Sequence, residues 1–186
     1  PGDGRMSAKI RLLVLDVDGT LTDGSIFLDG SGNEFKRFHV RDGMGIHRLR
    51  ASGVETAILS GRYSASTARR AGELGIHLLF NGVKDKLRFL VDLAEKLGMT
   101  RDEIAYVGDD LNDLDCIRWV GLGCAPADAV GEVRASARYV AEHPGGYGAV
   151  RDVAERILCI NGSSAAESER PDASSEAWRE TTGERE

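Results

Sequence analysis

The fold is decided by the stretch RLLVLDVDGTLT, residues 11–22. It begins with a run, residues 11–15, that is almost wholly apolar and that stops abruptly at Asp16. Runs this short and this apolar are typical of strands in a parallel sheet that is covered on both faces. The stretch therefore predicts a buried strand with two acids, Asp16 and Asp18, just beyond its end.

Four further runs repeat this pattern along the chain. They lie at residues 55–59, 77–80, 104–107 and 122–125. Helical patterns lie between them, most clearly at residues 43–52, 64–74 and 84–97, the last with a single apolar stripe. Strands that alternate with helices imply βαβ units, so we expect a doubly wound, Rossmann-like α/β fold with a parallel sheet.

One segment breaks the alternation. Residues 25–28 and 34–40 flank a Gly-rich turn at residues 29–33, which predicts a β-hairpin inserted after the first strand. We expect a leader at residues 1–9 and a single domain at residues 10–160, with the hairpin at about 25–40. From residue 161 the composition shifts to Ser, Glu, Ala and Arg, which predicts a disordered tail over residues 161–186.

The bulk composition excludes several classes of function. The chain has 186 residues, a hydrophobic fraction of 41% and a formal net charge of −6, which argues against a nucleic-acid partner. No apolar run approaches the ~20 residues that span a bilayer, so we expect no membrane partner. The three cysteines, Cys116, Cys124 and Cys159, form no CxxC pair. We expect them to be buried free thiols of a cytoplasmic protein.

The polar residues that follow the apolar runs carry the chemistry. They are Asp16 and Asp18 after the first run, Ser60 and Arg62 after the second, Lys86 early in the helix after the third, and Asp109 and Asp110 after the fourth. Ligands of open parallel sheets bind beyond the carboxyl ends of the strands. Folding is therefore expected to bring several acids, a hydroxyl and a lysine into one crevice.

Such a crevice suits phosphoryl transfer. Clustered carboxylates need a cation, and hard oxygen ligands without nearby Cys or His favour Mg²⁺. A carboxylate such as Asp16 can attack phosphorus, while a second acid protonates the leaving oxygen and then activates water. Lys86 and Ser60 can hold the phosphoryl oxygens in the transition state.

Each of these residues also has a simpler interpretation. An acid after a strand is often a helix cap or turn former, and Gly108-Asp109-Asp110 is also turn chemistry. Lys86 alone suits a solvated surface and Ser60 alone a helix cap. The joint pattern favours the site, because isolated acids beside buried strands cost free energy unless they are paired or metal-bound.

At this point the motifs resemble a known family. Asp16-Val17-Asp18-Gly19-Thr20 resembles the first motif, DxDGT, of the haloacid dehalogenase-like hydrolases. Ser60-Gly61-Arg62 resembles the second motif, Lys86 the third, and residues 108–113, GDDLND, the fourth. All four occur in the family's order at expected strand ends.

One branch of that family is more similar still. Residues 38–45 (FHVRDGMG), 106–110 (YVGDD) and 145–151 (GGYGAVR) resemble the 3-deoxy-D-manno-octulosonate 8-phosphate (KDO 8-phosphate) phosphatases. The similarity covers roughly residues 10–160. It extends to phosphatases of nine-carbon sialic-acid-type 9-phosphates and to the C-terminal domain of some CMP-sialic acid synthetases.

The resemblance implies a role for each matching position. Asp16 is implied as nucleophile and Mg²⁺ ligand, Asp18 as general acid/base that binds the metal through its backbone carbonyl, and Asp109 as the third protein ligand. Asp110 and Asp113 are implied to organise the metal loop. Substrate binding is implied for Ser60, Gly61, Arg62, Arg70 and Lys86, and for His39, Val40, Arg41, Asp42, Gly43 and His47.

Two of these positions depart from the branch. His39 stands where Asn is expected and His47 where Arg is expected. Histidine is shorter than arginine and only partly charged near neutral pH. The departures point either to weaker recognition of a carboxylate, to another substrate, or to neutral change at a pocket rim.

The branch is similar in having no separate cap domain and in forming homotetramers. Its hairpins build a central barrel, and a neighbouring subunit helps to close each active site. This organisation suits Ile26, Phe27, Phe35 and Phe38, which a lone two-stranded hairpin cannot bury. The alternative is that these side chains pack on their own domain. The segment Gly145-Gly146-Tyr147-Gly148 is either a reach into a neighbour's site or a flexible turn before the last helix.

Three functional hypotheses follow. The first is a Mg²⁺-dependent phosphatase of a phosphorylated sugar acid. We expect KDO 8-phosphate, a precursor in lipopolysaccharide synthesis, as its substrate, and a nine-carbon sialic-acid-type 9-phosphate as the alternative. The second is a non-catalytic tetramerising domain, against which the presence of every candidate catalytic residue argues. The third is a phospho-receiver domain, which carries its phosphorylated Asp at the third strand and has no counterpart of Asp18-Gly19-Thr20.

Overall fold

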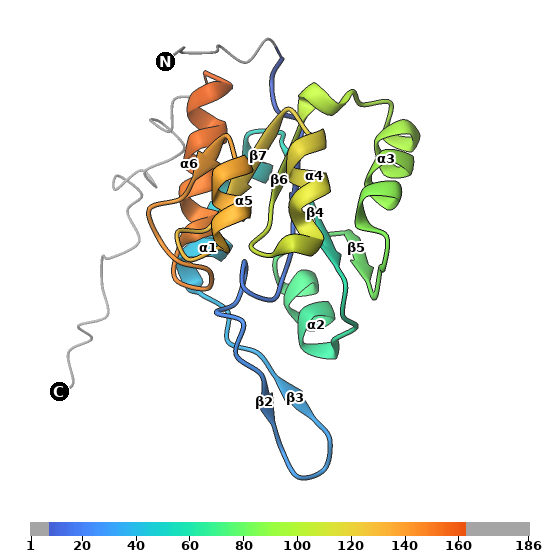
Figure 1. The fold of residues 1–186 in the computed structure, drawn as a ribbon, viewed down its shortest axis with the longest axis vertical. Coiled ribbons are helices and arrows are strands. Elements are labelled where there is room, and N and C mark those ends of the chain that lie inside the picture. Colours follow the sequence, from blue (N-terminus) through green and yellow to red (C-terminus); the bar gives the residue numbers. More distant parts are fainter. Residues whose placement is uncertain (1–7, 163–186) are drawn as a thin grey trace, which may run out of the picture.

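The computed structural model describes residues 8–162 and contains a six-stranded parallel sheet with the order β5-β4-β1-β6-β7-β8 (Figure 1). The strands are β1 Leu12–Leu15, β4 Glu55–Ser60, β5 Leu78–Asn81, β6 Ile104–Val107, β7 Leu122–Ala125 and β8 Tyr139–Val140. Every apolar run named from the sequence forms one of these strands, so the predicted α/β fold is confirmed. The chain adds strands on one side of β1 and then on the other, which places the topological switch point beside β1.

Helices cover both faces of the sheet. They are α1 Val40–Ala51, α2 Ala65–Glu73, α3 Lys86–Leu97, α4 Leu114–Trp119, α5 Gly131–Ser136 and α6 Ala149–Ile160, with short 3₁₀ helices η1 Arg101–Glu103 and η2 Leu111–Asp113. The elements α4, α5, β8 and α6 lie outside the helical and strand ranges that the sequence patterns defined. They complete the half of the fold that follows β6.

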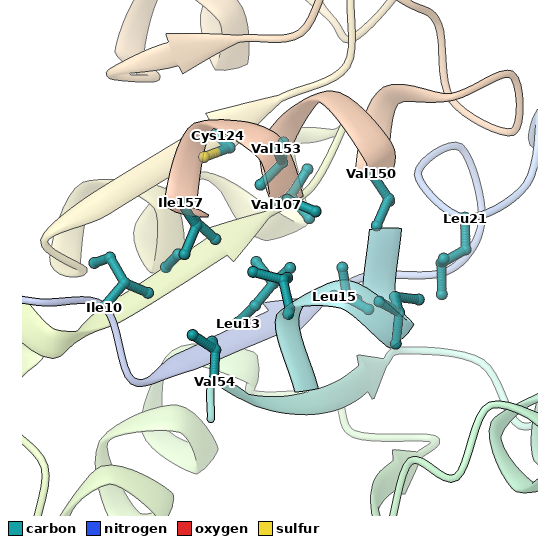
Figure 2. Packing of buried hydrophobic residues seen from close by; sticks show 14 of the residues in the cluster. Ile10, Leu13, Leu15, Leu21, Val54, Val107, Cys124, Val150, Val153 and Ile157 are labelled. Atoms are coloured by element: carbon teal, nitrogen blue, oxygen red, sulfur yellow. The ribbon is translucent and has the colours of Figure 1, made fainter. Parts of the chain in front are cut away.

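The central strand β1 explains why its sequence is apolar at every position. Leu13 and Leu15 join the core under α1 and α6, where Val150 and Ile157 pack (Figure 2). Leu12 and Val14 join the opposite core, under α3, α4 and α5. Because both faces are covered, the strand has no solvent-facing side, and its end delivers Asp16 to the middle of the sheet edge.

The predicted hairpin forms but is much shorter than expected. Its strands are β2 Phe27–Leu28 and β3 Glu34–Phe35, and it projects away from the body of the molecule (Figure 1). The turn is closed by Asp29, whose Oδ1 accepts hydrogen bonds from the backbone N–H groups of Ser31 (2.9 Å) and Asn33 (2.8 Å). No separate cap domain accompanies the hairpin within the described residues.

The prediction that the second hairpin strand runs to residue 40 is wrong. The strand ends at Phe35, and α1 begins at Val40, three residues earlier than the predicted helix start. His39 is extended (φ −97°, ψ 136°) and occupies the N-cap position without a capping hydrogen bond from its side chain, and Asp42 in the first turn favours a helix N-terminus. Lys36 turns inward to contact Asp18, which ends the alternation of the strand.

Most of the predicted leader and tail lies outside the described residues, so the domain division stays a prediction. From residue 8 to residue 162, the helices are all too short or too polar to cross a membrane. Cys116 and Cys124 are buried free thiols as expected, whereas Cys159 is exposed on α6, which corrects the expectation for that residue.

Candidate active site

The first acid, Asp16, lies at the carboxyl end of the central strand. Its backbone N–H continues the sheet ladder to the carbonyl of Val107 at 3.0 Å, and the residue is only 5% exposed. The chain then turns sharply at Gly19, where φ is +88°. A Cβ on Gly19 would meet Oδ2 of Asp109 at 2.0 Å, so only glycine allows the first and fourth motifs to approach this closely.

A lysine joins three of the predicted motifs. Lys86 is the first residue of α3, and its Nζ donates to Oδ1 of Asp16 and to Oδ1 of Asp113, both at 2.7 Å. The side chain is buried. Burial lowers the Lys86 pKa, but the charges of Asp16 and Asp113 outweigh it and the pKa is raised. Lys86 is therefore a fixed cation inside the site and not a solvated surface residue.

Asp113 holds the fourth-motif loop together. Its carboxylate accepts hydrogen bonds from the Tyr106 hydroxyl (2.6 Å), from Lys86, and from the backbone N–H groups of Asp109 (3.2 Å) and Asp110 (3.4 Å). The side chain has no exposed surface. These contacts agree with an organising role for Asp113. The involvement of Tyr106 was not predicted, since an apolar strand gave no sign that its tyrosine hydroxyl faces the site.

Three carboxylates gather at this point. Oxygen atoms of Asp16, Asp109 and Asp113 lie within 4.8 Å of one another. Burial, and then repulsion by Asp113, raises the pKa of Asp16 from 3.8 to about 7. Burial together with the charges of Asp16 and Asp113 raises the pKa of Asp109 to about 8. The single positive charge of Lys86 does not balance the three carboxylates of the cluster.

The donor set fits a hard divalent cation. Carboxylate oxygens are the ligands that Mg²⁺ prefers, and no Cys or His belongs to the cluster. A cation between Asp16 and Asp109 would offset the effects of burial and of neighbouring acids, which raise the pKa values of both carboxyls. Thr20, which donates to Oδ1 of Asp109 at 3.2 Å, fixes the orientation of that carboxylate.

A pocket of about 170 Å³ opens beside the carboxylate cluster. It is lined by Asp16, Asp18, Ser60, Gly61, Arg62, Asp109, Asp110 and Asn112. The structure therefore brings together all the strand-end residues singled out from the sequence, with Lys86 in contact through Asp16. Asn112 is an addition that the sequence did not single out by its chemistry.

Asp18 stands apart from the other acids at the mouth of the pocket. Its carboxylate contacts Nζ of Lys36, the residue that follows β3 by one position, and lies 3.9 Å from Nη1 of Arg62. Lys36 was not predicted, because a lysine in a hairpin with alternating charges is typically solvated. The cluster of carboxylates described above does not include the Asp18 side chain.

The remaining predicted substrate residues lie around α1, outside the lining of this pocket. Val40, Arg41 and His47 are exposed on α1, and Arg70 on α2 approaches Gly43 so closely that a Cβ there would meet its Nη2 at 2.8 Å. His39 is half-buried beside Tyr147, and its Nδ1 has no hydrogen-bond partner. Their contact with a substrate stays a prediction.

Asp42 is placed differently from its neighbours. It is 1% exposed, and its Oδ1 accepts a hydrogen bond from the backbone N–H of Arg151 at 3.0 Å, in the first turn of α6. Burial raises the pKa of this carboxyl. Within one chain, Asp42 faces the start of α6 and joins α1 to it.

Comparison with known proteins gives a consistent result. Residues 75–151 match the family model described as haloacid dehalogenase-like hydrolase. The chain is 45% identical over 154 residues to 3-deoxy-D-manno-octulosonate 8-phosphate phosphatase of Escherichia coli K12, covering 83% of this chain and 82% of that protein.

Solved structures give the same likeness. The Moraxella catarrhalis phosphatase of the same name, in complex with magnesium, phosphate and KDO, is 44% identical with a TM-score of 0.80, covering 82% of this chain and 88% of that chain. The cobalt-bound Haemophilus influenzae deoxy-D-mannose-octulosonate 8-phosphate phosphatase is 40% identical with a TM-score of 0.81, covering 86% and 94%.

Proposed function

Since the chain belongs to the haloacid dehalogenase-like hydrolases, in the branch of the 3-deoxy-D-manno-octulosonate 8-phosphate phosphatases, and is a phosphatase, we propose that its substrate is KDO 8-phosphate and that hydrolysis is Mg²⁺-dependent. The proposal includes an aspartyl-phosphate intermediate on Asp16. Its main support is the contact of Asp16 with Lys86 inside a cluster of oxygen ligands.

The first half-reaction transfers the phosphoryl group to Asp16. Its carboxylate attacks phosphorus, the bond from phosphorus to the sugar oxygen breaks, and Asp18 gives its proton to that leaving oxygen. Bound Mg²⁺, held by Asp16, Asp109 and the backbone carbonyl of Asp18, would supply positive charge to the phosphoryl oxygens. Lys86 and the Ser60 hydroxyl hold the same oxygens from the protein side.

The second half-reaction returns the enzyme to its starting state. Asp18, now ionised, takes a proton from a water molecule whose oxygen attacks phosphorus. The bond between phosphorus and Asp16 breaks, inorganic phosphate leaves, and Asp16 and Asp18 recover their original protonation states. One acid thus serves as donor and then as base, which requires that its position be held through the cycle.

Assembly is the second part of the proposal. The hairpin exposes Ile26 (55%), Phe27 (50%), Leu28 (69%) and Phe35 (58%). A hairpin of this size cannot bury these side chains by itself, and large exposed apolar side chains gathered in one element are typical of an interface. We infer a homotetramer joined through the hairpins, in which a neighbour completes the site near His39 and α1. We also propose a cytoplasmic location.

Substrate turnover tests the proposal. The full chain with Mg²⁺ is assayed for phosphate release from KDO 8-phosphate, a nine-carbon sugar-acid 9-phosphate and glucose 6-phosphate. We expect the highest kcat/KM for KDO 8-phosphate. A higher value for the nine-carbon substrate would transfer the proposal to that alternative.

Two controls accompany this assay. Asp16→Asn should lower kcat by more than about 10³-fold on every substrate, because the nucleophile is lost. Excess chelator should do the same to the unmodified chain. Full activity in either case would refute the mechanism, and a uniform lack of activity in the unmodified chain would favour the non-catalytic tetramerising domain.

A further inference from the structure

Lys36 occupies an environment that is unusual for a lysine on a hairpin. Its side chain is only 2% exposed, and its Nζ contacts the carboxylates of Asp18 and Glu34, the latter at 3.5 Å. Burying an ammonium group costs several kcal/mol unless it is paired, so the two acids fix where Lys36 can lie. A buried ion pair by itself is weak evidence for stability, which leaves room for another role.

The hairpin end of this arrangement is anchored to the body of the protein. Glu34, in β3, contacts Nη2 of Arg62, and its backbone carbonyl accepts a hydrogen bond from Oγ of Ser66 at 2.9 Å. Arg62 follows β4 and Ser66 lies in α2. Lys36 is therefore held between a fixed partner, Glu34, and the catalytic acid, Asp18.

The Asp18 carboxylate, at the catalytic end, has fewer partners than the Asp113 carboxylate. Asp113 has four hydrogen-bond donors from three other elements or loops, whereas the Asp18 carboxylate contacts Lys36 and, at 3.9 Å, Arg62. A displacement of ~1 Å in a reacting group can cost ~10²-fold in rate. The orientation of Asp18 thus rests mainly on a residue that the hairpin supplies.

We propose that Lys36 is a positioning residue that holds the Asp18 carboxylate for proton transfer to the leaving oxygen and from the attacking water. This inference rests on the proposed function, in which Asp18 is the general acid/base. It adds a hairpin residue to the machinery of the site, and it gives the hairpin a role in catalysis beside its role in assembly.

A double-mutant cycle tests the proposal. Lys36→Met, Asp18→Asn and the double variant are compared with the unmodified chain, using KDO 8-phosphate and Mg²⁺. With Asp18 present, Lys36→Met should lower kcat by about 10²-fold, with KM changed by less than about threefold. In the Asp18→Asn background the same substitution should lower kcat by less than about threefold, because the group that it positions is gone.

A leaving-group comparison supplies a second readout. The aryl oxygen of p-nitrophenyl phosphate leaves without a proton, so Lys36→Met should still form the phosphoenzyme quickly but hydrolyse it slowly. We expect a burst of about one p-nitrophenolate per active site in stopped-flow traces of this variant. Lys96→Met, an exposed lysine at the end of α3, is the matched control and should show neither change.

Three results would overturn the proposal. Equal losses of kcat in both backgrounds would mean that Lys36 does not act through Asp18, and a rise in KM in both would make it a substrate ligand. If Lys36→Met fails to fold by circular dichroism, Lys36→Arg carries the same cycle, and a loss that persists in the Asp18→Asn background refutes the idea. Lack of activity in the unmodified chain would instead refute the proposed function.

Discussion

The strand-end cluster and the hairpin of this molecule differ in how their side chains are buried and held by other residues. In the cluster, the side chains of Lys86, Asp16 and Asp113 are buried, and Lys86 bonds to both acids across elements far apart in the sequence. In the hairpin, three of the four pairing residues, Phe27, Leu28 and Phe35, carry large apolar side chains that face solvent within one chain. The difference accords with the proposal that the chemistry is built inside each subunit and that the hairpin surface meets a neighbour.

The largest effect on this comparison is expected from Asp113→Ala. It leaves Lys86 with one acid and the buried Tyr106 hydroxyl without its acceptor, and breaking a buried charged network typically costs ~3–5 kcal/mol. Urea unfolding followed by circular dichroism should show a loss of that size, together with loss of phosphatase activity.

The control for that experiment is Asp115→Ala, two residues further on and exposed. It should change the free energy of unfolding by less than about 0.5 kcal/mol. If both substitutions had the same effect, the cluster would not be the rigid region that its contacts indicate.

A somewhat smaller effect is expected from pH and metal. Asp16 and Asp109 have pKa values of about 7 and about 8 in the folded protein, against 3.8 ordinarily. Between the ordinary pKa of 3.8 and the folded values of about 7 and about 8, these carboxyls keep protons in the metal-free folded chain that they have lost in the unfolded chain. The free energy of unfolding must therefore fall as pH rises through this range. The stabilising contribution is complete below the unfolded value and is lost as pH passes the folded values.

Thermal unfolding with and without Mg²⁺ measures this linkage. At 100 times Kd, a ligand adds ~2.7 kcal/mol to the free energy of unfolding. Because Mg²⁺ must displace protons from the cluster at low pH, the rise in Tm at a fixed concentration should be greater near pH 8.5 than near pH 5. An equal rise at both pH values would contradict the assignment of these carboxylates as ligands.

The smallest effect on folding is expected in the hairpin. Phe27→Ser with Phe35→Ser removes the paired, half-exposed rings and should change the unfolding free energy of the isolated subunit by less than about 0.5 kcal/mol. Light scattering should nevertheless show dissociation of the proposed tetramer.

The control for the hairpin is Val140→Ser, on the edge strand β8, which removes a similarly exposed apolar residue elsewhere. It should leave the assembly intact. A pair of hairpin substitutions that unfolded the subunit while the assembly stayed whole would reverse the comparison between the two regions.

The same contrast explains what the sequence could predict. Runs such as residues 11–15 are apolar because both sheet faces are covered, so strand and strand end follow from one pattern. The residues after those runs then gather by topology alone, which is why Asp16, Ser60 and Asp109 were identified together. The roles expected for them remain proposals.

The sequence could not predict features that depend on tertiary contact. Lys36 has the spacing of a solvated hairpin residue, and only the fold turns it toward Asp18. The Tyr106 hydroxyl belongs to an apolar strand, and its contact with Asp113 depends on the loop that follows. The prediction that the second hairpin strand runs to residue 40 is wrong because the apolar and polar residues alternate only weakly there, and the chain instead begins a helix at Val40.

The measurement that tests the central claim most directly is the capture of the covalent intermediate. The enzyme is mixed with KDO 8-phosphate and Mg²⁺, quenched in acid within milliseconds and reduced with borohydride, which converts an aspartyl-phosphate to homoserine. Peptide mass spectrometry should place the reduced residue at position 16, at a yield that falls to background in Asp16→Asn. A reduced residue at another position, or turnover without any trapped species under single-turnover conditions, would contradict the claim that Asp16 is the nucleophile.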